Sequence, residues 1–112
     1  MSATDKKHIL AIGAHIGDVE ITAGLLLTKY AAAGHRATAL HLTAGEKGNP
    51  KMDHNEYRRQ RIGEAEAAAN KMGCSDCIVL DHPDAELHSN EKTHYEMCDL
   101  IRKLKPDIVL TH

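Results

Sequence analysis

The feature that most constrains the fold is a regular alternation between short apolar runs and longer segments with helical periodicity. Apolar runs typical of buried strands lie at residues 8–14, 37–43, 77–80 and 107–111. Helical patterns lie between them, at residues 18–33, 53–72 and 90–105. Strands that alternate with helices of this length predict a parallel, doubly wound α/β sheet. Right-handed crossovers favour the strand order 3-2-1-4, with the first two helices on one face and the third on the other.

The predicted sheet is open at one edge. The 112 residues suffice for one domain, and no linker, repeat or low-complexity segment divides them. One face of the sheet would carry a single helix, and the fourth strand would have no neighbour on its outer side. We therefore expect residues 1–112 to be one α/β domain that is incomplete at its C-terminus, the N-terminal part of a longer domain. An open strand edge also favours association between copies as a homo-oligomer.

Composition excludes several classes of function. The net charge is −2, and no run of lysine and arginine indicates a nucleic-acid partner. No apolar run approaches the ~18 residues that cross a membrane, and the polar residues 1–7 are too short for a signal peptide. We expect a cytoplasmic protein with reduced thiols. Cys74 and Cys77 have CxxC spacing, but no second pair completes a zinc site, which disfavours a metal or redox role.

Polar side chains follow each predicted strand at its carboxyl end, where open parallel sheets bind ligands. Every α/β protein has some polarity there, so this convergence indicates the place of a site more than its chemistry. The polar residues at the four strand ends are His15, Asp18, Thr43, Glu46, Asp81, His82, Asp84, Thr111 and His112.

The first of these strand ends, in IGAHIGDVE, leaves two interpretations open. His15 and Asp18 on a tight turn can converge on one cation, and imidazole with carboxylate suits Zn²⁺ or another divalent metal. Alternatively, Asp18 caps the following helix, although this leaves His15 unexplained. A phosphate cradle is disfavoured because no glycine-rich phosphate motif is present and acidic residues open the helix. A catalytic zinc site needs a third protein donor from elsewhere.

Arg61 lies on the otherwise apolar stripe of the second helix, with Glu64 near enough in sequence to hold it. One interpretation is a snorkelling arginine or an internal ion pair. The other is an arginine that reaches the strand-end cleft and binds a polar or anionic group of a substrate.

Five segments between about residues 8 and 112 resemble, in the correct order, one known family. They read AHIGDVE, LTAGEKG, RIGEAEAAANKMG, LDHPDAEL and KPDIVLTH. The chain resembles the LmbE / PIG-L family of metal-dependent N-deacetylases, whose first signature is A-H-P-D-D-x-E. The resemblance implies a Rossmann-like fold and a hydrolase, typically zinc-dependent, that removes the N-acetyl group from an N-acetylglucosamine-type conjugate.

The resemblance also implies roles for individual residues. His15 and Asp18 match the family's metal ligands, and Arg61 and Asp84 match positions associated with holding the sugar. The third ligand of the family is a histidine beyond residue 112, so His112 is not assigned as a ligand.

One departure bears on catalysis. Gly17 stands where the family has the aspartate that serves as general base. Glu46 is the candidate substitute and Glu20 a weaker one, which could instead orient His15. The departure supports two alternatives, a non-catalytic relative that binds metal or sugar, and an inactive fragment without the third ligand.

Overall fold

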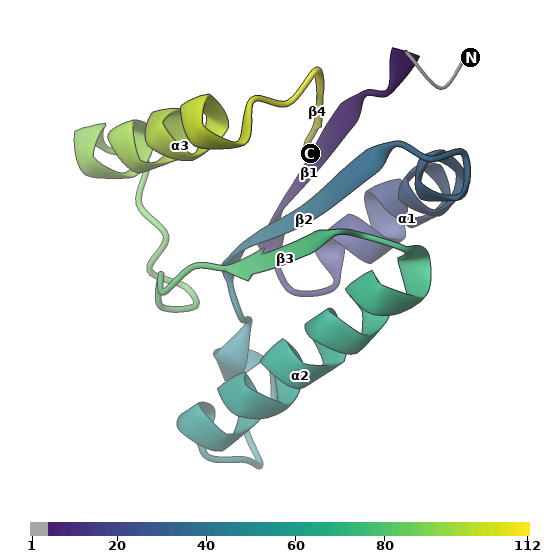
Figure 1. The fold of residues 1–112 in the computed structure, drawn as a ribbon. Helices are drawn as coiled ribbons and strands as arrows, with labels where there is room; N and C mark the ends of the chain where they lie inside the picture. The colour runs from purple at the N-terminus through teal and green to yellow at the C-terminus, as the bar shows by residue number, and fades with distance from the viewer. Residues whose placement is uncertain (1–4) are drawn as a thin grey trace.

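The computed structural model describes residues 5–112, which form four strands, three α-helices and one short 3₁₀ helix (Figure 1). The elements in chain order are β1 (His8–His15), α1 (Asp18–Ala32), β2 (Arg36–Thr43), η2 (Glu46–Gly48), α2 (His54–Met72), β3 (Asp76–Val79), α3 (Glu91–Leu104) and β4 (Ile108–Leu110).

The strands form one parallel sheet in the order β3-β2-β1-β4, which confirms the predicted topology. β1 and β2 lie at the centre, where Leu10 pairs with Thr38 and His15 with Thr43. Helices α1 and α2 pack on one side of the sheet, and α3 lies on the other (Figure 1). This is the arrangement that right-handed crossovers require when the chain reverses direction across the sheet after β3.

Capping residues explain where α2 and α3 begin and end. The Asp53 carboxylate accepts the backbone N–H groups of Asn55 and Glu56, and the Asn90 side chain accepts that of Thr93. Gly73 ends α2 in the left-handed conformation, with φ 88°. These three residues lie at the ends of the helical patterns 53–72 and 90–105 that the sequence predicts.

The apolar core lies between α1 and the central strands. Val19, Ala23 and Leu27 recur on one face of α1 and are almost completely buried. They pack with Ile9 and Ala11 of β1 and with alanines of β2. Small side chains on β2 let the helix approach the sheet closely, and Met72 of α2 borders the same cluster.

Helix α3 differs from the other two because none of its residues is buried. The helix has an apolar stripe, but this stripe makes no substantial contact with any strand. Polar bonds hold its C-terminal end to β1. The His8 ring donates from Nδ1 to the Leu104 carbonyl at 2.9 Å, and the Asp107 carboxylate accepts the His8 N–H at 2.8 Å.

Strand and helix bounds agree with the predicted ranges within a residue or two, and the short helix η2 lies between β2 and α2, where the sequence predicts no element. Within the described residues, no helix is long and apolar enough to cross a membrane.

Candidate metal centre

The turn between β1 and α1 places the first two candidate residues. Gly17 is the N-cap of α1, with φ 112° and ψ −32°, a conformation that side-chain-bearing residues rarely adopt. Asp18 is therefore the first helical residue rather than the cap, and its carboxylate turns back to accept the His15 N–H at 2.8 Å. The interpretation of Asp18 as a helix cap is wrong, because its side chain makes no cap bond.

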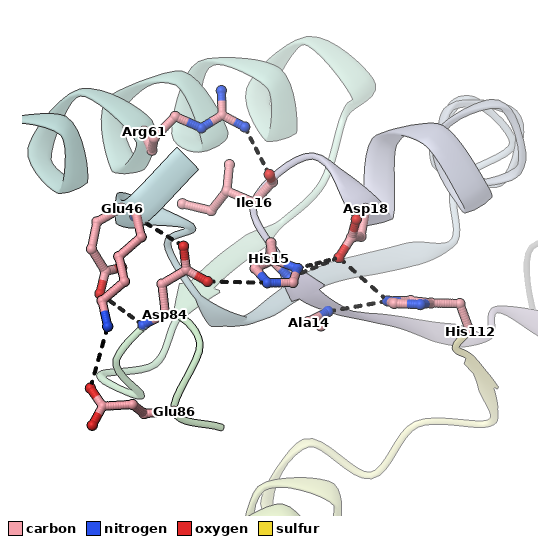
Figure 2. Close-up of polar contacts among 10 residues, drawn as sticks. Ala14, His15, Ile16, Asp18, Glu46, Arg61, Asp84, Glu86 and His112 are labelled. Carbon is pink, nitrogen blue, oxygen red and sulfur yellow. Dashed lines mark hydrogen bonds and ion pairs between the residues drawn. The ribbon is translucent and has the colours of Figure 1, made fainter. Parts of the chain in front are cut away.

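The same carboxylate oxygen faces the His15 ring (Figure 2). His15 Nδ1 and Asp18 Oδ2 lie 3.3 Å apart. A tetrahedral metal with bonds of about 2.1 Å separates neighbouring donor atoms by about 3.4 Å, so the pair fits two positions of such a site. Partial burial raises the pKa of Asp18, but hydrogen bonds from the backbone and ring of His15 outweigh this effect and hold the pKa below its ordinary value. The carboxylate is thus kept in the ionised form that binds metal.

The other ring nitrogen of His15 faces Asp84. His15 Nε2 and Asp84 Oδ1 lie 3.2 Å apart, across the ring from Asp18. Asp84 is buried, and its second oxygen accepts the Lys47 N–H at 2.9 Å. Its own N–H donates to Glu46 Oε2 at 2.8 Å. The structure thus brings four sequence-predicted positions, residues 15, 18, 46 and 84, into one chain of contacts.

His112, at the end of β4, approaches the same centre from the opposite side. Its Nε2 lies 3.5 Å from Asp18 Oδ2 and accepts the Ala14 N–H at 3.2 Å. A nitrogen that accepts this N–H has its lone pair engaged and does not present it to a metal. Within residues 5–112, no three His, Cys, Asp or Glu side chains are grouped so that they could hold a metal ion.

Arg61 lies on the far side of the turn. Its Nη2 donates to the Ile16 carbonyl at 2.7 Å, and its Nη1 donates to Glu64 at 2.9 Å (Figure 2). The predicted pairing with Glu64 is therefore present. Arg61 also lines a cavity of about 190 Å³ beside Gly17 and Glu20. The structure does not bring its guanidinium into contact with His15 or Asp18.

Glu20 does not contact the His15 ring in the structure, although orientation of His15 was one of its predicted roles. Its carboxylate lies 3.9 Å from Nε2 of His41, a completely buried residue of β2. Burial lowers the pKa of His41, and the negative charge on Glu20 opposes this effect only in part, so the imidazole is neutral at pH 7.

Sequence reasoning missed two parts of this centre. His41 was read only as part of a buried strand, because nothing in a strand pattern indicates which neighbour a buried histidine will meet. The contact of His112 with Asp18 was also missed, although its place after the last strand put it at the correct edge of the sheet.

The chain is similar in sequence to one known family and to curated proteins of two activities. The model of the PIG-L family, described as GlcNAc-PI de-N-acetylase, matches residues 10–112. Diacetylchitobiose deacetylase of Thermococcus kodakarensis is 31% identical over 95% of this chain and 40% of its own length. The 4-oxalmesaconate hydratase of Pseudomonas putida is 28% identical over 97% of this chain and 45% of its own length. The chain thus spans about half or less of the length of these relatives.

Solved structures give the same two classes of relative. The N,N′-diacetylchitobiose deacetylase of Pyrococcus horikoshii superposes with a TM-score of 0.88 and 26% identity, over 95% of this chain and 40% of that one. The 4-carboxy-2-hydroxymuconate hydratase GalB of Pseudomonas putida superposes with a TM-score of 0.84 and 26% identity, over 95% of this chain and 47% of that one. With the family match over residues 10–112, these similarities establish that the chain belongs to the PIG-L family.

Proposed function

We propose that this protein is a metal-dependent hydrolase that removes the N-acetyl group from an N-acetylglucosamine-type amino sugar derivative. The observation that carries the proposal is the 3.3 Å approach of His15 Nδ1 and Asp18 Oδ2 at the carboxyl end of β1. That position is where open parallel sheets bind their ligands. The deacetylases among the relatives indicate the class of substrate.

In this proposal His15 and Asp18 hold Zn²⁺ or another divalent cation, and a third donor lies outside residues 1–112. A metal bound there supplies Lewis-acid polarisation of the amide carbonyl and a water of lowered pKa. Arg61 and Asp84 line the side of the site that faces the substrate. Asp84 borders the His15 ring, and Arg61 borders the cavity beside Gly17.

Gly17 provides no proton acceptor, so another residue must take this role. A positioned base contributes about 10²–10⁴-fold to such reactions, and its loss slows the reaction without removing the contribution of the metal. This departure supports the alternative of a relative that binds metal or sugar without turnover.

The similarity to hydratases supports a different reaction as a second candidate. Their identity to this chain and their structural agreement are comparable to those of the deacetylases. A divalent metal held by His15 and Asp18 would supply the same chemistry, activation of water and polarisation of a carbonyl, for hydration of an unsaturated carboxylic acid as for hydrolysis of an amide.

The test is Zn²⁺ binding by the protein at full length, measured by calorimetry, together with acetate release from N-acetylglucosaminides. We expect one equivalent of Zn²⁺ to bind, and His15→Ala to weaken binding by at least about 100-fold with the fold retained. His54→Ala, a change at an exposed histidine at the start of α2, is the matched control and should bind normally.

Each outcome separates the candidates. Absence of stoichiometric Zn²⁺ in the wild-type protein contradicts the proposal. Binding without acetate release supports the non-catalytic alternative. Binding with water addition to an unsaturated dicarboxylic acid, and no acetate release, supports a hydratase.

A further inference from the structure

The turn between β1 and α1 is held by hydrogen bonds from three different elements. The Ile16 N–H donates to the Thr43 carbonyl of β2 at 3.2 Å, and the Ile21 N–H of α1 donates to the Gly17 carbonyl at 3.1 Å. The Ile16 carbonyl accepts instead from a side chain of α2, with 2.7 Å between its oxygen and Arg61 Nη2 (Figure 2). The orientation of the peptide that joins residues 16 and 17 thus depends on a bond from α2.

That peptide adjoins a residue with little resistance to rotation. Gly17 has φ 112°, and glycine enters positive φ about as readily as negative φ because it has no Cβ. The absent side chain also makes room for the arginine, since a Cβ at Gly17 would lie 3.3 Å from Arg61 Nη2. The glycine therefore loosens the turn and, at the same time, admits the group that can fix it.

The guanidinium of Arg61 is itself held in place. Its Nη1 donates to Glu64 Oε1 at 2.9 Å, and the arginine side chain is 25% exposed. The bond from Nη2 to the Ile16 carbonyl is partly buried, and Ile16 is a buried residue. A hydrogen bond from a charged donor is stronger than one between neutral groups, so its loss has a larger effect on the peptide that accepts it.

The two candidate metal ligands flank this peptide. His15 precedes Ile16, and Asp18 follows Gly17. The His15 N–H donates to Asp18 Oδ2 at 2.8 Å, which draws the carboxylate towards the imidazole ring. Rotation of the peptide between residues 16 and 17 would shift His15 and Asp18 relative to each other, because it lies between them in the chain.

We propose that Arg61 is a positioning residue: its bond to the Ile16 carbonyl fixes the turn at Gly17 and thereby holds His15 and Asp18 in the arrangement that binds a metal ion. This inference rests on the proposed function, in which His15 and Asp18 are metal ligands. It adds to the substrate contact proposed for Arg61, because the two bonds use only part of the N–H donors of a guanidinium.

The experiment compares the full-length wild-type protein with Arg61→Met, Arg61→Lys and Arg59→Met. Methionine keeps an unbranched apolar stem but donates no hydrogen bond, whereas the lysine ammonium can still donate to the Ile16 carbonyl. Arg59→Met is the matched control, because it makes the same substitution at an exposed arginine of α2.

The first readout is the NMR order parameter of the Gly17 amide in the metal-free protein. We expect a value of about 0.85 in the wild type, typical of rigid backbone, and below about 0.6 in Arg61→Met. The Leu10 amide, in the buried part of β1, is the internal reference and should stay rigid in both. A residue that contributed only to global stability would leave the order parameters of the folded protein unchanged.

The second readout is Zn²⁺ affinity by calorimetry. Arg61→Met should bind Zn²⁺ about 10-fold more weakly, of the order found when the outer partners of metal ligands are removed. The removal of a positive charge would by itself favour a cation, so electrostatics cannot produce this loss. Arg61→Lys should lie closer to the wild type in both readouts, and Arg59→Met should match it.

The inference is overturned if Arg61→Met keeps the wild-type order parameter at Gly17. It is also overturned if Zn²⁺ affinity is unchanged and only the KM for an acetylated amino sugar rises, which is the behaviour of a substrate contact alone. If Arg61→Met does not fold, Arg61→Gln, with its shorter side chain, takes its place with the same expectation. A wild type that binds no Zn²⁺ contradicts the proposed function, whereas the order parameters still decide whether Arg61 fixes the turn.

Discussion

The two sides of the sheet are held by different kinds of interaction. On the side of α1, apolar side chains such as Val19 and Leu27 are completely buried against β1 and β2. On the side of α3, no helical residue is buried, and polar bonds through His8 fix only the end of the helix. The comparison shows that an apolar stripe makes a helix able to pack against a sheet, but that burial also requires apolar side chains on the sheet to pack with it.

The largest expected difference between the sides concerns side-chain truncation. Leu27→Ala should lower the free energy of unfolding by about 3 kcal/mol, because it leaves a cavity in the core. Leu100→Ala on α3 should lower it by less than about 1 kcal/mol, because the side chain is only partly buried. Urea unfolding followed by circular dichroism measures both. Equal losses would show that the apolar face of α3 is covered in solution.

The second expected difference between the two sides of the sheet is in the reactivity of their cysteine thiols. Burial raises the pKa of the Cys77 thiol on β3 to about 11, with smaller contributions from the charges on Glu66 and Glu20. At pH 8 only about one such thiol in a thousand is the reactive thiolate. Cys98 on α3 is exposed and should react with iodoacetamide about 100-fold faster or more. Mass spectrometry after timed labelling measures both rates, and unfolding in urea should make them similar.

The smallest expected effect is acid sensitivity of the polar contacts on the α3 side. Burial raises the pKa of Asp76, but hydrogen bonds from Arg36 and Thr38 outweigh this effect, and the pKa lies below its ordinary value. The charged form therefore stabilises the fold above the unfolded-state pKa of about 4, and this contribution is lost as the pH falls through the lower folded-state value.

The Thr38 hydroxyl, which donates to Asp76, also bonds the His8 ring that holds the end of α3. Protection of the α3 amides relative to their intrinsic exchange rates should thus fall below about pH 4, by about 1 kcal/mol or less because Asp76 is partly exposed. Asp76→Asn should flatten this dependence. An unchanged pH profile in that variant would show that Asp76 does not contribute.

Much of this fold was predictable because its signals are local. Residues such as Asp53, Gly73 and Asn90 act on the turn in which they stand, so a sequence pattern is sufficient to place them. The strand order followed from the handedness of crossovers, which is a general rule rather than a property of particular side chains.

The centre itself was predictable only in part. The place of His15, Glu46 and Asp84 at one edge of the sheet followed from topology. The direction of each side chain did not, since it depends on contacts such as the Arg61 bond to the Ile16 carbonyl, made over 45 residues of sequence. For the same reason the sequence left two interpretations of Asp18 open, a metal ligand and a helix cap; the structure excludes the cap, because the Asp18 carboxylate accepts the His15 N–H instead.

The backbone at Gly17 has a consequence for how this protein relates to family members that carry an aspartate there. With φ 112°, a side chain at this position would be strained by about 1–3 kcal/mol, and its Cβ would lie 3.3 Å from the Arg61 guanidinium. Restoring the carboxylate by a single substitution therefore carries a conformational cost, because the backbone is strained and the Arg61 guanidinium has to move aside. The glycine thus affects both the chemistry of this position and the freedom of the turn to accept another residue.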